Sequence, residues 1–153
     1  MELGFEELKR EVLELYNGIK YMVLATSSNN QVTARSMSCV FEDINILFQT
    51  DIKFAKVRQI QENTQVALCA NNLQIEGIAQ IKGSPMDVTN IYFIDEFKRQ
   101  HESSYNNYSR IADEVVIEVA PSKITLWKYE NGIPFRDFLL VEEKKAYREY
   151  YEG

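Results

Sequence analysis

Arg35, Thr50 and Lys56 have the side-chain types and the spacing to bind a phosphate group. The planar guanidinium of arginine can donate two parallel hydrogen bonds to phosphate oxygens. Thr50 ends a run of β-forming residues, and Lys56 follows in the first turn of an expected helix, where free backbone amides also attract anions. We expect each charge-assisted hydrogen bond to contribute about 1.5–3 kcal/mol, so that several together hold a phosphate dianion. The alternative is that Arg35 and Lys56 are ordinary solvated cations.

The neighbours of these residues bear on the candidate site in opposite ways. Ser36 and Ser38 are small, so a ligand could approach the backbone of their strand closely. Asp51 is expected to cap the N-terminus of the following helix. Its carboxylate would oppose a bound phosphate unless it turns away, which counts against the site.

The bulk properties of the chain predict a folded globular protein. Its 153 residues suit one domain, and 45% of them are apolar while 26% are charged. The net charge of −6 argues against broad nucleic-acid binding, which usually needs a basic face. The acidic N-terminal stretch lacks the features of a signal peptide, and no apolar run approaches the ~20 residues of a membrane helix. We therefore expect a cytoplasmic protein that binds neither nucleic acid nor membrane.

The cysteines and the single histidine do not form a catalytic or metal-binding pattern. Cys39 and Cys69 are far apart and each falls in an expected strand, so we expect two buried, reduced thiols. His101 lies in a polar stretch and is expected at the surface. Alone it cannot complete a zinc site or a Ser-His-Asp triad. We therefore expect no metal and name no catalytic residue.

Hydrophobic periodicity predicts one α+β domain over residues 1–153, mainly β, built on a small antiparallel barrel with peripheral helices. The cleanest strand alternation is at 73–82, where every second residue from Leu73 to Ile81 is apolar or glycine. The barrel is expected at about 20–140, between an amphipathic helix at 5–17 and a charged, helical tail at 141–153. Further helices are expected at 53–62 and 86–101, a loop at 102–109, and strands at 21–26, 31–41, 44–50, 65–70, 73–82, 114–120 and 123–129.

The order of these features resembles that of a known family. The features are a strand "MVLAT", an arginine in the next strand "VTARSMSCVF", a strand "INILFQT" ending in threonine, a lysine six residues on, and then "QVALC" and "IEGIAQIKG". In this order the chain resembles the FMN-binding split-barrel superfamily, whose best-known member is pyridoxamine 5'-phosphate oxidase. It is also similar to the general-stress and nitroimidazole-resistance branches of that superfamily. The similarity runs from about Lys20 to Arg136, and it implies an antiparallel split β-barrel.

The resemblance also implies roles for individual residues. Arg35 and Lys56 match the two cations that bind the phosphate of FMN, which accounts for a lysine at a helix start. The remaining matches are flavin contacts. They are Ser36, Met37 and Ser38 along the ring, Gln49 and Thr50 at the strand end, Gln74 or Asn72 before Gly77, and, more weakly, Trp127 and Arg136, supplied by one or the other subunit of a homodimer.

The chain also departs from the oxidase pattern. Ala55 stands where the oxidase has a further phosphate-binding arginine, and Val40 stands where it has a substrate-binding lysine. The resemblance therefore implies an FMN-dependent oxidoreductase that passes electrons from NAD(P)H to a small acceptor, such as a nitro compound or a quinone, rather than vitamin B6 oxidation. The alternatives are a non-catalytic flavin-binding stress or sensor protein, or a split barrel that binds haem or a deazaflavin.

Overall fold

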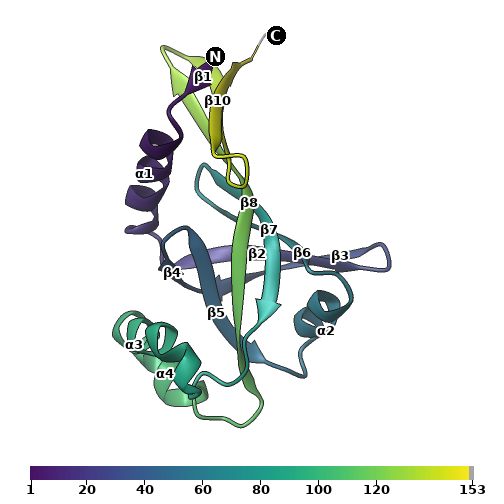
Figure 1. The fold of residues 1–153 in the computed structure, drawn as a ribbon. Coiled ribbons are helices and arrows are strands. Elements are labelled where there is room, and N and C mark those ends of the chain that lie inside the picture. Colours follow the sequence, from purple (N-terminus) through teal and green to yellow (C-terminus); the bar gives the residue numbers. More distant parts are fainter. Residues whose placement is uncertain (152–153) are drawn as a thin grey trace.

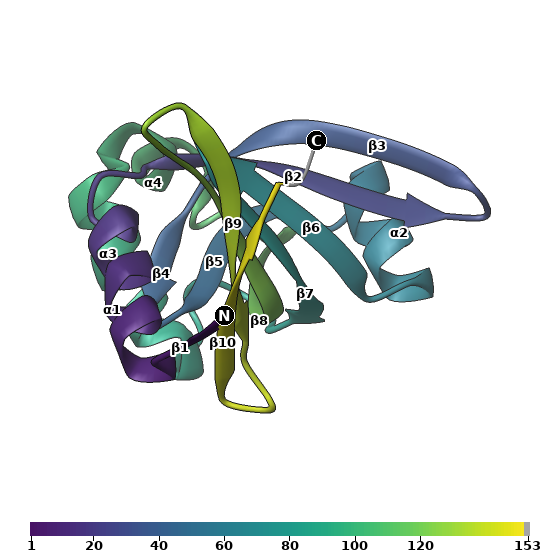
Figure 2. The ribbon, with the colours of Figure 1, turned by 90° about the horizontal axis from the view of Figure 1, so that it is seen from above.

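The computed structural model describes residues 1–151. In chain order its elements are β1 (Glu2–Leu3), α1 (Phe5–Tyr16), β2 (Tyr21–Ser28), β3 (Gln31–Ser38), β4 (Val40–Glu42), β5 (Asn45–Asp51), α2 (Ala55–Glu62), β6 (Gln65–Ala70), β7 (Leu73–Ile81), the 3-10 helix η1 (Val88–Asn90), α3 (Ile91–Gln100), α4 (Glu102–Tyr108), β8 (Glu114–Glu130), β9 (Ile133–Leu140) and β10 (Lys145–Tyr150). Figures 1 and 2 show α1 along one side of a strongly curved sheet, α2 beside the β2–β3 hairpin, and α3 and α4 at the end away from both termini.

Strand β8 joins the two halves of this sheet. One of its edges pairs with β7, while the other pairs first with β5 and then with β9. The sheet order is β1-β10-β9-β8-β7-β6-β2-β3, with β4 and β5 attached off this path, and neighbouring strands run antiparallel. This arrangement confirms the expected α+β split barrel, mainly β with peripheral helices.

The prediction of two separate strands at 114–120 and 123–129 is wrong, because β8 runs unbroken through Pro121, the residue expected to part them. The register between β7 and β8 shifts at Glu76/Gly77, which places Pro121 opposite Gly77. A β-bulge of this kind tolerates a residue that cannot donate a ladder hydrogen bond. The strand therefore continues where its sequence contains a strand breaker.

We expect Gly77→Ala to destabilise the fold by about 1–3 kcal/mol through overpacking. A Cβ at this position would lie 2.7 Å from the carbonyl oxygen of Ala120 and 2.9 Å from Cγ1 of Val119. Urea unfolding measures the effect, with Gly18→Ala as the matched control, because the nearest atom to a Cβ there is 3.9 Å away. Equal unfolding midpoints for the two variants would contradict this account of the bulge.

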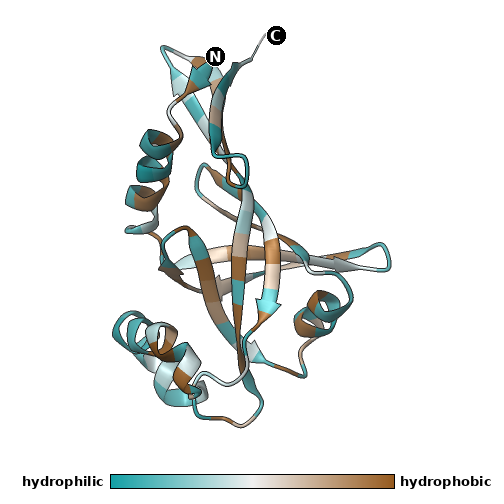
Figure 3. Ribbon diagram, viewed as in Figure 1, coloured by the Kyte–Doolittle hydropathy of each residue, from teal (hydrophilic) through white to brown (hydrophobic). Residues whose placement is uncertain are grey.

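The core lies inside the curve of the sheet, where α1 and α2 cover it. Residues 46–50 of β5 are buried without interruption, and Figure 3 shows β5 brown along most of its length. In β7 the residues alternate between buried and exposed from Leu73 to Gln80, as predicted. Because β5 is buried on both faces, Ile46, Leu47 and Phe48 follow one another without a polar residue between them, whereas β7 has one face open to solvent.

Several predicted elements need correction. The helix expected at 86–101 is divided into η1 and α3, and the loop expected at 102–109 is mostly the helix α4. The tail expected to be helical pairs as β10 with β9 instead, and residues 152–153 lie outside the described chain. Asp51 ends β5 and is not an N-cap, because α2 begins four residues later with Phe54 as its N-cap; the Asp51 carboxylate accepts a hydrogen bond from the backbone N–H of Lys53 at 2.8 Å. In residues 1–151 no helix has the length and hydropathy needed to cross a membrane.

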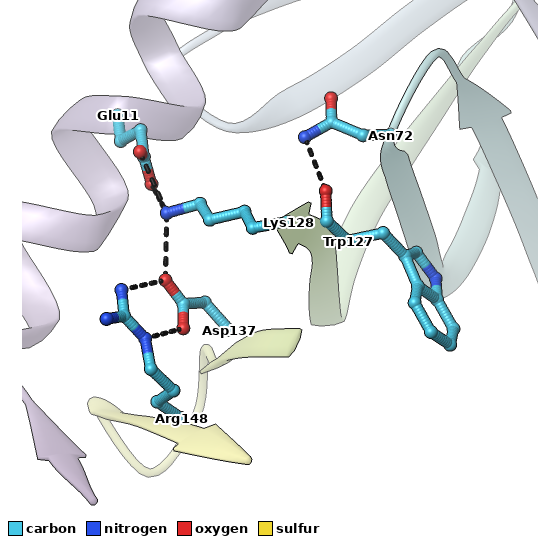
Figure 4. Close-up of polar contacts among 6 residues, drawn as sticks. All are labelled: Glu11, Asn72, Trp127, Lys128, Asp137 and Arg148. Carbon is cyan, nitrogen blue, oxygen red and sulfur yellow. Dashed lines mark hydrogen bonds and ion pairs between the residues drawn. The ribbon is translucent and has the colours of Figure 1, made fainter. Parts of the chain in front are cut away.

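An ion network around the buried carboxylate of Asp137 fastens α1 to the β8–β9–β10 end of the sheet (Figure 4). The Asp137 side chain is 1% exposed and accepts hydrogen bonds from Lys128 Nζ at 2.8 Å and Arg148 Nε at 2.7 Å. Lys128 also donates to Glu11 of α1 at 2.6 Å. Burial alone would raise the pKa of Asp137, but the hydrogen bonds from Arg148 and Lys128 outweigh it and hold that pKa below its usual value.

Candidate functional site

A cleft of about 440 Å³ lies beside α3 and α4, the helices that Figure 1 shows at the end away from both termini. It is bounded by β3, the end of β5, the start of α2, the helices α3 and α4, and the start of β8. Six residues predicted for the site line it: Ser36, Met37, Ser38, Gln49, Thr50 and Lys56. The other lining residues are Asp51, Phe54, Phe97, Ser104, Tyr108, Ile111 and Glu114.

The junction between β5 and α2 positions the lysine in this cleft. Thr50 is the second-last residue of β5, and Lys56 lies in the first turn of α2. The Lys56 ammonium donates a hydrogen bond to the Thr50 hydroxyl at 3.0 Å and lies 4.6 Å from the centre of the Phe54 ring. The spacing of six residues therefore places the ammonium next to the strand end, as an anion site requires.

Arg35 is not one of the residues that line the cleft, although it is close to Lys56. Its guanidinium donates to the Thr26 hydroxyl at 2.8 Å, to the backbone oxygen of Leu24 at 3.3 Å, and to the Thr33 hydroxyl. Burial lowers the pKa of Lys56, and the positive charge of Arg35 lowers it further. The two cations lie in the same region of the molecule, because Thr26 and Thr33 bind both the Arg35 guanidinium and the Gln59 side chain of α2.

A polar cluster that the sequence analysis missed ties Arg35 to the helix carrying Lys56. Gln59, one turn after Lys56, is buried, and its side-chain oxygen accepts hydrogen bonds from Thr26 at 2.5 Å and Thr33 at 2.8 Å. The hydroxyl oxygens of the same two threonines accept hydrogen bonds from the guanidinium of Arg35. Thr26 could have been noticed, because it continues the buried face of Met22 and Leu24 along its strand. Nothing in the helix pattern marks Gln59.

Two carboxyl groups also line the cleft. Glu114 opens β8, is buried, and pairs in register with Asp51 of β5. Burial raises the pKa of Glu114, the nearby charge of Asp51 raises it further, and the charge of Lys56 opposes both effects. Sequence analysis missed Glu114 as a site residue, because its place opposite Asp51 depends on long-range strand pairing.

The helical segment α3–α4 closes one side of the cleft and brings an unexpected histidine into the interior. His101 joins the two helices and is buried, not exposed as predicted, with Nε2 3.0 Å from the backbone oxygen of Cys39. The contact spans 62 positions in the chain, so a polar local sequence did not reveal it. Cys39 is buried as expected, and burial raises the pKa of its thiol to about 12, whereas Cys69 is exposed on the outer face of β6, contrary to prediction.

The other predicted flavin contacts lie away from this cleft. Trp127 and Arg136 are opposite one another on β8 and β9, with the guanidinium 4.9 Å from the centre of the indole ring. Trp127 is 43% exposed and turns away from the ion network, whereas its neighbour Leu126 is buried (Figure 4). Gln74 is exposed on β7, and Asn72 donates to the backbone oxygen of Trp127 at 3.0 Å. None of these four side chains lines the Ser36–Lys56 cleft within one chain.

Comparison with known proteins identifies the family. The family model described as pyridoxamine 5'-phosphate oxidase matches residues 8–128, which is most of the chain. The chain belongs to the pyridoxamine 5'-phosphate oxidase family. A search of curated proteins found no match.

Three solved structures are similar to this oxidase-family chain. A pyridoxamine 5'-phosphate oxidase-related, FMN-binding protein from Nostoc punctiforme PCC 73102 has a TM-score of 0.66 at 14% identity, covering 99% of this chain and 98% of that one. General Stress Protein 26 from Bacillus anthracis str. Sterne has a TM-score of 0.61 at 22% identity, with coverages of 77% and 92%. HutZ, the haem storage protein from Vibrio cholerae, has a TM-score of 0.67 at 13% identity, with coverages of 78% and 94%. At these identities the three structures share the fold.

The charges in and beside the Ser36–Lys56 cleft fit a phosphate-bearing cofactor. Among residues 1–151, no carboxylate lies within ion-pair distance of the Arg35 guanidinium or the Lys56 ammonium. Both cations bind hydroxyl groups instead, and burial together with the positive charge of Arg35 lowers the pKa of Lys56. The charges of Glu114 and Asp51 act in the opposite direction on Lys56, whose pKa nevertheless stays below its usual value. A dianion placed between the cations would relieve their repulsion.

Proposed function

We propose that the protein binds FMN in the Ser36–Lys56 cleft and acts as a flavin-dependent oxidoreductase. The observation that carries this proposal is the lysine at the start of α2, bonded to Thr50 at the edge of a cleft and close enough to Arg35 for the guanidinium to lower its pKa. The family adds support, as does the fold shared with an FMN-binding protein.

The residues of the chain would bind and orient the cofactor. Arg35 and Lys56 hold the phosphate, and the hydroxyl of Thr50 donates to a phosphate oxygen. The backbone of Ser36–Ser38 supports the flat ring, since the small side chains of Ser36 and Ser38 leave that backbone accessible. The flavin itself supplies the redox chemistry when it is bound, and the protein contributes binding, orientation and electrostatics.

We also propose that the active form is a homodimer. The exposed aromatic side chains of Trp127 and Tyr129 lie on the β8–β9 end of the sheet, and aromatic residues are enriched at protein interfaces. In such a dimer Trp127 and Arg136 of one subunit would reach the cleft of the other. This would account for two predicted flavin contacts that lie away from the cleft of their own chain.

The proposed activity uses NAD(P)H as electron donor and a small molecule as acceptor, and its test is spectroscopic. The FMN-loaded protein should be yellow, should bleach with NAD(P)H in the absence of oxygen, and should regain its colour when a quinone or a nitro compound is added. A flavin that binds but never bleaches would indicate a non-catalytic flavin-binding protein instead.

Haem binding is a second candidate because of the fold shared with HutZ. His101, the only histidine, would have to leave its contact with Cys39 to reach haem iron. Titration with hemin distinguishes the two cofactors: a sharp Soret band with no response to FMN would favour haem.

We expect Lys56→Ala to weaken FMN about tenfold and to leave riboflavin binding nearly unchanged, since one charge-assisted hydrogen bond to phosphate is lost. Fluorescence titration with both ligands measures this. Lys53→Ala is the control, because that lysine is exposed and pairs with Asp113. An equal loss for FMN and riboflavin would mean that Lys56 acts through folding.

We expect Glu114→Gln to bind FMN about two- to fivefold more tightly than the wild type at neutral pH, because it removes a negative charge beside the phosphate. The raised pKa of Glu114 sets the pH dependence. As the pH falls toward that pKa the wild-type carboxyl becomes neutral, so the ratio of the two affinities should shrink toward one. Glu118→Gln, on the same strand and hydrogen-bonded to Asn45, is the control. Equal FMN affinities of Glu114→Gln and the wild type at every pH would contradict this effect of the Glu114 charge.

A further inference from the structure

We propose that Ser109 is a positioning residue that directs an N–H group of the Gln49 side chain into the cleft, where it donates to the flavin ring. The proposal rests on the proposed function, because the acceptor is the bound flavin. It concerns a residue at the end of α4 that no motif in the sequence marks.

The contact between these side chains is buried and spans 60 positions in the chain. Ser109 is 0% exposed and follows the last residue of α4, where its backbone N–H bonds to the backbone oxygen of Tyr105 at 3.2 Å. Its hydroxyl donates to the side-chain oxygen of Gln49 at 2.8 Å. Gln49 is 8% exposed and lines the cleft near the end of β5.

This contact determines which side of the amide faces the ligand. Within residues 1–151 no hydrogen bond engages the Nε2 atom of Gln49, and no side-chain polar atom sealed from solvent lacks a partner. The Nε2 atom is therefore open to solvent, and the cleft is the space that Gln49 lines. With the oxygen occupied by Ser109, the amide presents two N–H donors toward that space.

Donors of this kind suit the polar edge of a flavin. The carbonyl oxygens and N1 of the ring accept hydrogen bonds and become more negative when the ring is reduced, whereas N5 takes up a proton and becomes a donor. A fixed N–H group therefore stabilises reduced flavin more than oxidised flavin. Without the Ser109 hydroxyl the amide can turn, and its oxygen would then repel the same acceptors.

The test compares the affinities of the protein for oxidised and reduced FMN. We expect Ser109→Ala to reduce the preference for reduced FMN by about two- to tenfold and to alter the visible spectrum of the bound flavin, with Ser109→Thr restoring both. Gln49→Glu, which keeps the acceptor for Ser109 but loses the N–H groups, should reduce the preference at least as much. Ser103→Ala, on the exposed face of α4, should change neither. A wild-type preference and spectrum in Ser109→Ala would overturn the proposal.

A second measurement on the free protein separates failure of this proposal from failure of the proposed function. The side-chain amide signals of Gln49 in a ¹⁵N NMR spectrum, assigned by their loss in Gln49→Glu, should be sharp in the wild type and shifted in Ser109→Ala. Unchanged signals would overturn the positioning role. Shifted signals in a protein that does not bind FMN would support the positioning role of Ser109. The same result would show that flavin is not the ligand, and would therefore overturn the proposed function.

Discussion

Replacing Arg35 with alanine should weaken FMN binding about 100-fold, the largest effect on affinity that we expect. The guanidinium can form two charge-assisted hydrogen bonds with the phosphate, each contributing about 1.5–3 kcal/mol. It is held in place by Thr26, Thr33 and the backbone oxygen of Leu24, so little side-chain freedom remains to be lost on binding. Isothermal titration with FMN measures the loss.

Two further variants make this result interpretable. Arg35→Lys keeps the charge but not the paired hydrogen bonds, and it should bind FMN with intermediate affinity. Arg58→Ala removes an exposed cation from the same region of the chain, on α2 but outside the cleft, and should bind like the wild type. If Arg35→Ala and Arg58→Ala bind FMN equally well, the phosphate is not at Arg35.

The second large effect concerns stability. We expect Asp137→Ala to lower the free energy of unfolding by about 3 kcal/mol, the lower end of the range for breaking a buried ion pair, because Lys128 and Arg148 remain partly exposed. The pKa of Asp137 is lowered in the folded state, so its contribution is present above the unfolded pKa of about 3.9 and is lost as the pH falls through the folded pKa. Urea unfolding at pH 7 and at lower pH measures both effects.

A matched control comes from a neighbouring ion pair. Glu149 lies at the surface and pairs with Arg136 at 2.8 Å, so Glu149→Ala should cost no more than about 1 kcal/mol. An Asp137→Ala protein as stable as Glu149→Ala would mean that the network in Figure 4 does not fasten the β8–β9–β10 end of the sheet.

Local sequence patterns were enough to predict which face of a strand is buried and where some strands end. Apolar alternation predicted the two faces of β7, and the run that ends at Thr50 predicted the end of β5 to within one residue. The six-residue step from Thr50 to Lys56 predicted that both side chains belong to one site, and in the structure the two are hydrogen-bonded. These features depend on neighbours in the sequence, so the sequence alone contains them.

Long-range packing determined what the sequence analysis missed. His101 became buried through a contact with Cys39, Gln59 through contacts with Thr26 and Thr33, and Glu114 through its pairing with Asp51. The charged tail reads as a helix, but Ala146 is buried in a strand because β9 offers a free edge. In each case tertiary contacts outweighed local propensity.

Two cations that converge on one phosphate should be visible in a crystal structure of the FMN complex. We expect phosphate oxygens within about 3.2 Å of both the Arg35 guanidinium and the Lys56 ammonium. A phosphate bound elsewhere, with these two side chains still bonded only to Thr26, Thr33 and Thr50, would contradict it.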